Sequence, residues 1–216
     1  MGTIERRERE KEQRRTVIIS AAEELFFSKG IANTTMDEIA EKVELSKGAI
    51  YLYFKSKEEL FAAIAQRGLA IVHELFVAAA TRGDNGLERL RAIGDEFYRF
   101  HLEYPNYFSA IFYHEFHASI QNKEDTASLE LLKQAEELME LTTRVIQEGI
   151  ADGSIRKDVD PQIAAVILDG FLTGIIRMVS AERDHMMKCH DIDPQNLVNT
   201  AMNMIFHALK GPAVKE

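Results

Sequence analysis

Apolar residues recur at helical spacing along most of the chain, and the clearest pattern lies between residues 34 and 60. The first stripe there occupies positions i, i+3, i+4 and i+7, namely Met36, Ile39, Ala40 and Val43. Such a stripe predicts the buried face of a short helix. Glu44 and Leu45 then make a turn, and Ile50 and Phe54, at i and i+4, give the buried face of a second short helix. The pattern predicts a helix-turn-helix followed by the start of a third helix.

Polar residues at the helix starts support these boundaries. Thr35 is followed three residues later by Glu38, the spacing of a capping box, in which the two residues satisfy each other's backbone N–H groups. Ser56 and Glu59 repeat this spacing before the third helix. Ser46 stands at the N-cap of the second helix, where a hydroxyl can accept a backbone hydrogen bond.

The outward face of the second helix is unusual for a solvated surface. It carries a cation, a glycine, a leucine and two tyrosines, namely Lys47, Gly48, Tyr51, Leu52 and Tyr53. A glycine permits close approach to DNA, lysine supplies positive charge, and tyrosine can bond phosphates while covering sugars. We therefore expect this helix to enter a major groove.

At these residues the chain resembles a known family. The run TTMDEIAEKV followed by SKGAIYLYFKSKEEL is similar to the helix-turn-helix of TetR/AcrR transcriptional repressors, over about residues 17 to 60. The resemblance implies a homodimer on a palindromic DNA operator, released by a small organic effector that binds in the C-terminal part. It also implies that the last two helices pair with those of a second subunit.

The expected DNA contacts follow from position in the motif. They are Thr35, Ser46, Lys47, Gly48, Tyr51, Leu52, Tyr53 and Lys57. Thr35 and Lys57 stand at helix starts, where free backbone N–H groups and the helix dipole favour phosphate. With Tyr53 they are expected to contact phosphates, while Lys47, Gly48, Tyr51 and Leu52 are expected to face the major groove.

Helical patterns and their punctuation continue to the end of the chain. We expect further helices over Arg14–Lys29, Lys57 to about Thr81, Leu87 to about Glu103, Asn106 to about Ile120, Thr126–Ala151, Pro161 to about Met187, and Pro194–Leu209. Asp-Pro pairs open the last two, because aspartate caps a helix and proline suits its first position. With no convincing alternating strand, the fold is predicted to be all-α with about nine helices. Residues 1–60 are expected to bind DNA and residues 61–216 to bind the effector and dimerise.

Charge is distributed unevenly along the chain. Residues 1–67 contain 12 basic and 12 acidic residues, so the remainder carries the whole net charge of −9. An acidic body need not touch DNA, and it repels duplex away from the reading head. The segment from Thr3 to Arg15 alternates basic and acidic residues. It is either a solvated helix extension or a basic arm that touches the minor groove.

The sequence favours a soluble, cytoplasmic protein. Cys189 is the single cysteine, so no intramolecular disulfide can form. The N-terminal run MGTIERREREKEQRR has no apolar core and is not expected to be a signal peptide. The apolar stretch from residue 163 to 179 is interrupted by Asp169 and Arg177, so we expect no membrane span.

Half of the phenylalanines and tyrosines lie between residues 97 and 116. Two neighbouring helices this rich in rings could wall an apolar pocket, and plain core packing is the competing interpretation. The family resemblance favours the pocket, with an apolar or aromatic effector. The expected ligand-binding residues are Phe97, Phe100, Phe108, Phe112, Tyr113, His114, Phe116 and His117.

Two histidine clusters leave a metal-dependent alternative open. His114 and His117 are three residues apart, whereas a zincin helix places its histidines four apart. A second cluster is His185, Cys189 and His190. An all-α enzyme built on His114 and His117 is the alternative function, but the chain lacks a nucleophile–base spacing, a phosphate loop or a full ligand set. We therefore expect neither catalysis nor a cofactor.

Gly170 and Gly174 form a GxxxG pattern, which lets another helix approach one face closely. Apolar residues surround the two glycines and recur on the last helix. The expected dimer interface therefore includes Gly170, Gly174, Met202 and Phe206. Burial of the same surface within one subunit is the competing interpretation.

Overall fold

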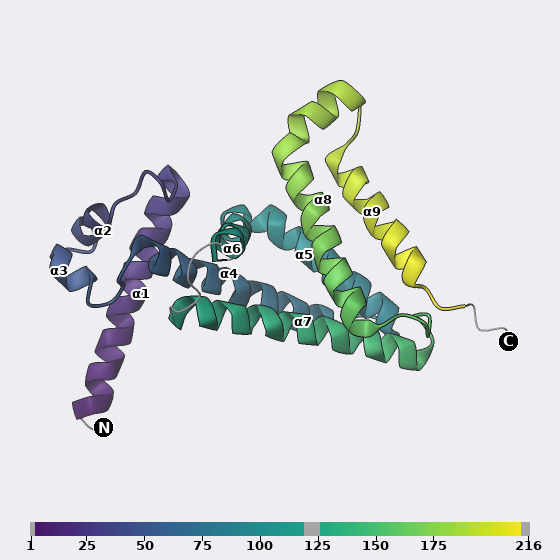
Figure 1. Ribbon diagram of the computed structural model, residues 1–216, viewed down its shortest axis with the longest axis horizontal. Coiled ribbons are helices and arrows are strands. Elements are labelled where there is room, and N and C mark those ends of the chain that lie inside the picture. The colour runs from purple at the N-terminus through teal and green to yellow at the C-terminus, as the bar shows by residue number, and fades with distance from the viewer. Residues whose placement is uncertain (1–2, 119–125, 213–216) are drawn as a thin grey trace. The chain divides into compact units, whose positions relative to one another are not determined.

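The computed structural model describes residues 3–118 and 126–212, and within them the chain is helical with no strand (Figure 1). The helices are α1 (Thr3–Lys29), α2 (Met36–Lys42), α3 (Lys47–Ile50), α4 (Lys57–Ala79), α5 (Gly86–Glu103), α6 (Pro105–Ala118), α7 (Thr126–Asp152), α8 (Pro161–His190) and α9 (Pro194–Leu209). The all-α prediction is confirmed. An isolated antiparallel bridge joins Ile155 to Lys210.

The predicted punctuation accounts for most helix ends. Gly30 ends α1 with a φ of +80°, a left-handed conformation that glycine adopts without strain. Asp193 caps α9 by accepting a 3.0 Å hydrogen bond from the N–H of Asn196. α1 is continuous from Thr3, so the interpretation of the charged N-terminal segment as a helix extension is confirmed. α8 differs from expectation, because it continues three residues past Met187.

The capping box expected before α4 is only half formed. The Ser56 hydroxyl accepts a hydrogen bond from the N–H of Glu59 at 3.1 Å, as predicted. The Glu59 carboxylate accepts from the N–H of Lys55 at 2.6 Å, one residue before the cap. The reciprocal bond is displaced because the turn before α4 exposes the Lys55 N–H to the same carboxylate.

The chain divides into two compact units. One comprises Met1–Ala70 with Asn106–Gln134, and the other comprises Ile71–Pro105 with Ala135–Glu216. These units reflect packing, whereas the functional division at residue 60 stays a prediction. α4 is one unbroken helix across residues 70 and 71, which belong to different units.

The first unit is built around the helix-turn-helix. Its fully buried side chains come from α1, α2, α3 and α4 and from the turn after α3, namely Ile18, Ile39, Ile50, Phe54, Leu60 and Ile64. Burying each large apolar side chain contributes about 1.5–3 kcal/mol, so this small core accounts for much of the unit's stability. Arg15 of α1 adds a cation–π contact, with its guanidinium carbon 5.0 Å from the centre of the Phe54 ring.

Glu23 of α1 connects α1 to α4 and α6 in the same unit. It accepts a 2.8 Å hydrogen bond from Arg67 and a 2.7 Å bond from the Tyr107 hydroxyl. Burial, reinforced by the bond to Glu23, raises the pKa of Tyr107 to about 12. Tyr107 therefore remains a neutral donor throughout the physiological range.

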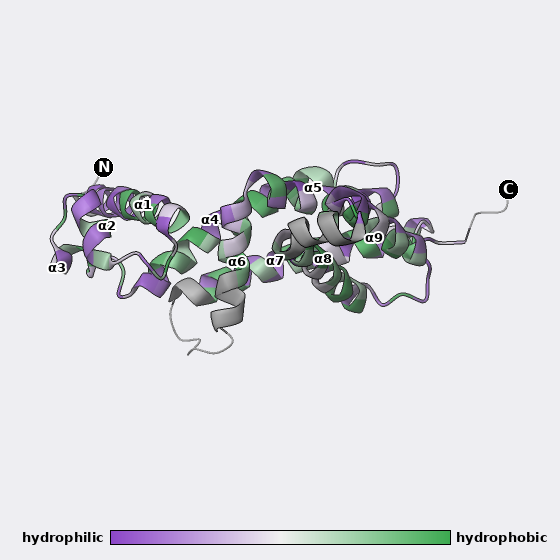
Figure 2. Cartoon of the chain, turned by 90° about the horizontal axis from the view of Figure 1, so that it is seen from above, coloured by the Kyte–Doolittle hydropathy of each residue, from purple (hydrophilic) through white to green (hydrophobic). Residues whose placement is uncertain are grey.

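Two glycines of α5 mark close helix contacts in the second unit. A Cβ on Gly94 of α5 would lie 3.0 Å from the Met202 side chain of α9. A Cβ on Gly86 would lie 2.2 Å from the backbone of Gly149 in α7. α5 therefore packs closely against both α7 and α9. Hydrophobic and hydrophilic residues alternate along the helices, as Figure 2 shows by colour.

Two helices are long and apolar enough to cross a membrane by length and composition. They are Lys57–Ala79, whose apolar window is 50% buried, and Pro161–Ala181, whose window is 33% buried. A core helix can satisfy the same criteria, and residues 60–65 of α4 are buried in the first unit. The low burial of the α8 window instead means that an apolar surface faces outward.

Candidate nucleic-acid interface

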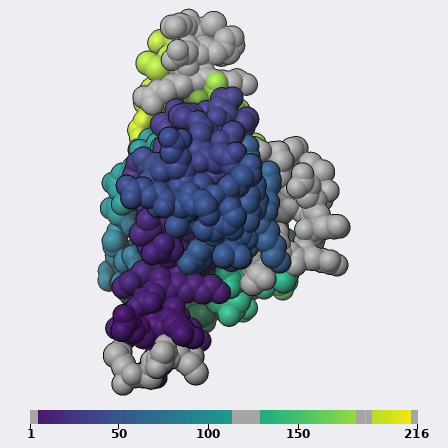
Figure 3. Space-filling model, turned by 90° about the vertical axis from the view of Figure 1, so that its left-hand side faces the viewer, coloured from purple at the N-terminus to yellow at the C-terminus, as the bar shows by residue number. Residues whose placement is uncertain are grey.

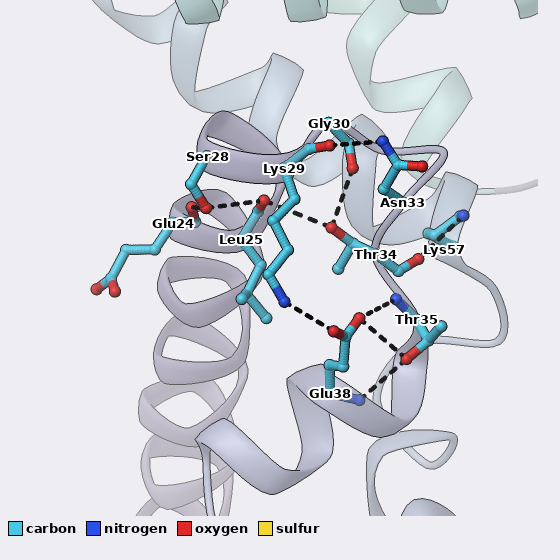
Figure 4. A network of polar contacts seen from close by, with 10 residues as sticks. All are labelled: Glu24, Leu25, Ser28, Lys29, Gly30, Asn33, Thr34, Thr35, Glu38 and Lys57. Atoms are coloured by element: carbon cyan, nitrogen blue, oxygen red, sulfur yellow. Dashed lines mark hydrogen bonds and ion pairs between the residues drawn. The ribbon is translucent and has the colours of Figure 1, made fainter.

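The start of α2 is fixed by a network around Glu38 (Figure 4). Thr35 and Glu38 form the predicted capping box, with the Thr35 N–H donating to the carboxylate at 2.9 Å and the Glu38 N–H donating to the Thr35 hydroxyl at 3.2 Å. The Lys29 ammonium donates to the same carboxylate at 2.7 Å. The pKa of Glu38 falls to about 2, chiefly because of the Lys29 hydrogen bond and then the Thr35 N–H. This network ties the end of α1 to the start of α2.

Thr34 and Lys57 extend the network towards α4. The Thr34 hydroxyl, buried beside α1, donates to the Gly30 carbonyl at 3.0 Å. The Lys57 ammonium donates to the Thr34 carbonyl at 3.1 Å (Figure 4). The starts of α2 and α4 thus lie side by side, which brings the two predicted phosphate contacts Thr35 and Lys57 together.

α3 is short and anchored at both ends. The Ser46 hydroxyl accepts a 3.2 Å hydrogen bond from the N–H of Ala49, as expected of an N-cap. The helix ends at Ile50, so residues 51–53 form a turn instead of continuing the predicted helix. Ile50 and Phe54, on either side of this turn, are fully buried, as predicted, and they anchor it to the core.

Exposed residues lie on the outer side of α3 and of the turn that follows it. Tyr51 is 42% exposed, and Leu52 is 80% exposed, although its side chain is entirely apolar. Gly48 is also exposed, and a Cβ built on it would meet no atom within 4 Å. Packing within the subunit therefore gives no reason for glycine at this position, whereas close approach by an outside partner does.

Lys47, at the first position of α3, is held by a neighbour from α2. Its ammonium lies 2.9 Å from the Asp37 carboxylate, and both side chains are exposed. The hydrogen bond to Asp37 raises the pKa of Lys47, which keeps the side chain charged. A DNA phosphate or base that binds Lys47 must compete with Asp37.

Tyr53 is half-buried and lines a groove of about 820 Å³ between α1 and the turn that joins α2 to α3. Apolar side chains of the groove come from both elements, namely Val17, Ile18, Val43 and Leu45. Charged side chains of α1 also line it. The sequence pattern did not reveal this groove, because its two walls are far apart in the chain.

The predicted effector residues are only partly described. Phe97, Phe100 and Phe108 are buried, and Phe112 is half-buried. Phe97 packs edge-on against Phe76, with the two ring centres 6.0 Å apart. The ring centres of Phe108 and Phe112 are 4.6 Å apart. Each contact lies within one compact unit. The side chains of Tyr113, His114, Phe116 and His117 lie outside the described residues, as do those of His185, Cys189 and His190.

The second unit contains polar groups that the sequence pattern does not indicate as functional. The Ser180 hydroxyl of α8 lies 3.0 Å from His101 Nε2 of α5, and burial lowers the pKa of His101. Nearby in sequence on α8, the hydroxyl oxygen of Thr173 is buried and has no hydrogen-bond partner within residues 3–118 and 126–212. Such a group costs free energy unless a ligand or water satisfies it. No local sequence signal marks it.

The predicted dimer residues fall into two groups. Gly170 and Gly174 are exposed, and a Cβ on either would meet no atom within 4 Å. Met202 and Phe206 are 2% and 4% exposed, because they pack under Gly94 within one subunit. Other apolar side chains accompany the glycines on the surface, namely Ile163, Val166, Ile167 and Met178 of α8 and Met204 of α9.

Comparison with known proteins also indicates a DNA-binding regulator. Residues 18–64 match the family model for bacterial regulatory proteins of the tetR family, and residues 83–177 match a tetracyclin repressor-like C-terminal domain. The uncharacterised regulator YfiR of Bacillus subtilis is 28% identical over 68% of this chain and 70% of its own length. Three further curated regulators are matched over less than half of their length, whereas the repressor KstR2 of Rhodococcus jostii is 28% identical over 71% of this chain and 74% of its own.

Solved structures agree over nearly the whole chain. A TetR/AcrR regulator from Thermobifida fusca has a TM-score of 0.65 and 27% identity, covering 94% of this chain and 100% of that one. AibR, solved in complex with isovaleryl coenzyme A and operator DNA, has a TM-score of 0.63 at 22% identity, covering 89% of this chain and 98% of its own. The second likeness shows the fold alone.

A capped and anchored helix-turn-helix joined to a helical C-terminal domain defines a DNA-binding transcriptional regulator. The chain belongs to the TetR family of such regulators. Homodimers and small-molecule effectors bound in the C-terminal domain are typical of that family.

Proposed function

We propose that this regulator is a repressor that binds a palindromic operator as a homodimer in the cytoplasm and leaves it when a small organic effector binds. The observation that carries the proposal is the tip of the helix-turn-helix. There an exposed leucine and tyrosine are presented between two fully buried anchors, Ile50 and Phe54. A rigid, exposed tip of this kind is suited to entering a groove.

The DNA contacts divide by chemistry. Lys47, Gly48, Tyr51 and Leu52 face the major groove, and Ser46 positions them by capping α3. Thr35, Tyr53 and Lys57 contact phosphates. The adjacent helix starts that carry Thr35 and Lys57 support this, because free backbone N–H groups and helix dipoles both attract anions. Phosphate contacts position the head, and base contacts give it sequence preference.

The dimer forms through α8 and α9. Two exposed glycines with open space above them allow a second α8 to approach closely. The flanking isoleucines, valine and methionines then bury apolar surface that one subunit leaves in water. A two-fold dimer places two recognition helices on successive major grooves, which a single head cannot do.

The effector is largely apolar or aromatic and binds in the C-terminal part. In the first unit the rings of Phe108 and Phe112 support an apolar site. In the second unit the buried rings of Phe97 and Phe100 support one, with the unsatisfied Thr173 hydroxyl as a polar contact. The effector must bind the DNA-free state more tightly than the DNA-bound state, since equal affinity shifts nothing. A tenfold loss of operator affinity needs about 1.4 kcal/mol of coupling.

Selection of bound duplexes from random DNA tests the first half of this proposal. We expect a palindromic consensus with two half-sites about one helical turn apart. Lys57→Gln should weaken binding to all sequences alike, whereas Tyr51→Phe should alter the selected half-site if its hydroxyl reaches a base. A selection that yields no preferred sequence contradicts the proposal.

A compound screen tests the second half. Compounds are scored in parallel for thermal stabilisation and for release of the selected operator, with Phe112→Ala as the variant that enlarges the site. We expect some stabilising compounds to release DNA and Phe112→Ala to weaken them. Stabilising compounds that never change DNA affinity would show that the site is not a switch.

A further inference from the structure

The N-terminal half of α1 extends well beyond the core that it supports. Residues 5 to 14 are all exposed, and the first fully buried residue of the helix is Ile18. In Figure 3 this part of α1, in dark purple, projects past the helix-turn-helix drawn in blue. An unpacked charged helix of about three turns adds little to the stability of the head.

The charges of this extension are sorted by helical face. Arg7, Lys11 and Arg14 are spaced i, i+4 and i+7, so they form one stripe, and all three line the groove beside the α2–α3 turn. None of the three has a carboxylate within salt-bridge distance in the described part of the chain. Neighbouring glutamates point elsewhere, since Glu8 and Glu12 do not line the groove.

Acidic side chains do not neutralise the stripe. Of the two carboxylates that line the groove, Glu10 is held by Arg6 at 2.8 Å. Glu44, in the turn, is the other. Three cations therefore face one remaining carboxylate, although residues 1–67 are neutral in sum. The charge balance of the whole segment conceals a locally basic surface.

We infer that Arg7, Lys11 and Arg14 bind the phosphate backbone of operator DNA outside the segment read by α3. This inference rests on the proposed DNA-binding function and extends its footprint. The groove also contains Tyr53, a proposed phosphate contact, so the stripe continues the surface that meets the duplex. From residue 7 to residue 14 the helix rises about 10.5 Å, which matches about three nucleotides of one strand.

Phosphate contact explains the residue types better than base reading. Three long cations spaced along one helix face suit a row of phosphates, whereas base reading by arginine or lysine would be confined to guanine edges in the grooves. Their contribution is therefore independent of flanking sequence and strongly dependent on salt, because each neutralised phosphate releases counterions. An acidic protein partner is the competing occupant of the same groove, and it makes no prediction about DNA.

The test compares a triple variant, R7Q/K11Q/R14Q, with a charge-matched control, R144Q/K157Q/K210Q, whose three cations are exposed on the second unit. The probe is the duplex that the wild-type chain selects from random DNA. It is prepared at minimal length and with about 10 base pairs, or one helical turn, added on each side. Affinity is measured as a function of salt concentration, and circular dichroism checks helix content.

The wild type and the control should bind the longer duplex at least tenfold more tightly than the minimal one. The triple variant should lose this preference, and its salt slope should fall by up to about 5 per dimer, from six lost contacts at about 0.9 each. The variant R7K/R14K, which keeps the charges, should behave as wild type. Lysine preserves the positive charge but not the forked geometry of the guanidinium. Wild-type behaviour of R7K/R14K would therefore show that charge matters at these positions and that a specific structural contact of arginine does not.

Three results would overturn the inference. The triple variant could retain the wild-type length preference and salt slope, which would leave the groove to another occupant. Its loss could depend on the added sequence, which would indicate base reading. Its loss could persist in R7K/R14K, which would indicate a structural role. Failure of the wild type to bind any duplex would instead refute the proposed function itself.

Discussion

The helix-turn-helix tip and the outer face of α8 are both exposed and both partly apolar, but they are built differently. The tip is held by hydrogen bonds and anchors close to Leu52 in the chain, including the Ser46 cap and the buried Ile50 and Phe54. The α8 face carries Gly170 and Gly174, and a Cβ on either would meet no atom within 4 Å. The tip is therefore a surface made from local contacts, whereas the α8 face is proposed to be covered by a second copy of the chain.

The largest expected effect separates anchor from tip. Phe54→Ala removes a fully buried ring and should lower the free energy of unfolding by about 3–5 kcal/mol. Leu52→Ala, only two residues away, should change that free energy by less than about 0.5 kcal/mol, because the side chain is 80% exposed. Denaturant unfolding measures both.

The same pair should behave differently towards DNA. Leu52→Ala should weaken operator binding while leaving the fold intact, because its side chain is proposed to lie in the groove. Binding by Phe54→Ala should be lost together with folding of the head. Equal stability losses in the two variants would mean that the tip is not separable from its anchors.

The next largest effect concerns the α8 face. Gly174→Arg introduces a long cation where two helices are proposed to meet and should convert the dimer to monomer, with weaker operator binding. Ala151→Arg on α7, also at an exposed helical position, is the control and should remain dimeric. Sedimentation at micromolar concentration distinguishes them. A wild-type chain that is monomeric under those conditions refutes the interface itself.

These two regions also differ in how far sequence could predict them. Capping at Thr35 and Ser46 and the burial of Ile50 and Phe54 followed from residues at most a few positions apart. Such signals are local, so periodicity and cap chemistry suffice. The early end of α3 at Ile50 did not follow, because residues 51–53 fit a helical pattern as well as a turn.

In the second unit, apolar spacing predicted helices but not which face meets which. Met202 and Met204 both lie on the apolar last helix, and their residue type is the same. The structure buries Met202 against Gly94, which is far away in the chain, and leaves Met204 70% exposed. The stripe of Arg7, Lys11 and Arg14 was hidden for a similar reason. Its significance depends on the α2–α3 turn, which forms the other wall of the groove.

A smaller effect is expected at Thr173 of the second unit. Thr173→Val replaces a buried hydroxyl that has no partner in the described part of the chain, so it should stabilise the effector-free protein by about 1 kcal/mol. If the effector bonds this hydroxyl, the same change should weaken effector binding by roughly tenfold, equivalent to about 1.4 kcal/mol. Thermal unfolding and effector titration measure the two effects. Unchanged effector affinity would remove Thr173 from the site.

The smallest effects come from two exposed acidic groups, one in each unit. The pKa of Glu38 is lowered to about 2, mainly by its hydrogen bond to Lys29, and that of Asp158 to about 2, mainly by its hydrogen bond to Arg156. A pKa that is lower in the folded state contributes stability above the unfolded value, which is lost as pH falls through the folded value. Both contributions should therefore be complete at neutral pH. The contribution of Glu38 should disappear between about pH 4.5 and pH 2, and that of Asp158 between about pH 3.8 and pH 2.

The two pairs nevertheless differ in what they connect. Glu38 joins α2 to Lys29 at the end of α1, whereas Asp158 bonds a residue only two positions away in the same loop. Arg156 and Asp158 can keep their contact in an unfolded chain, so part of that stabilisation is absent from the folding equilibrium. Glu38→Gln should therefore flatten the acid dependence of the unfolding free energy more than Asp158→Asn, with the exposed Glu41→Gln as control. If Asp158→Asn flattens the acid dependence equally, the ion pair that connects α1 and α2 stabilises the folded chain no more than the pair within the loop.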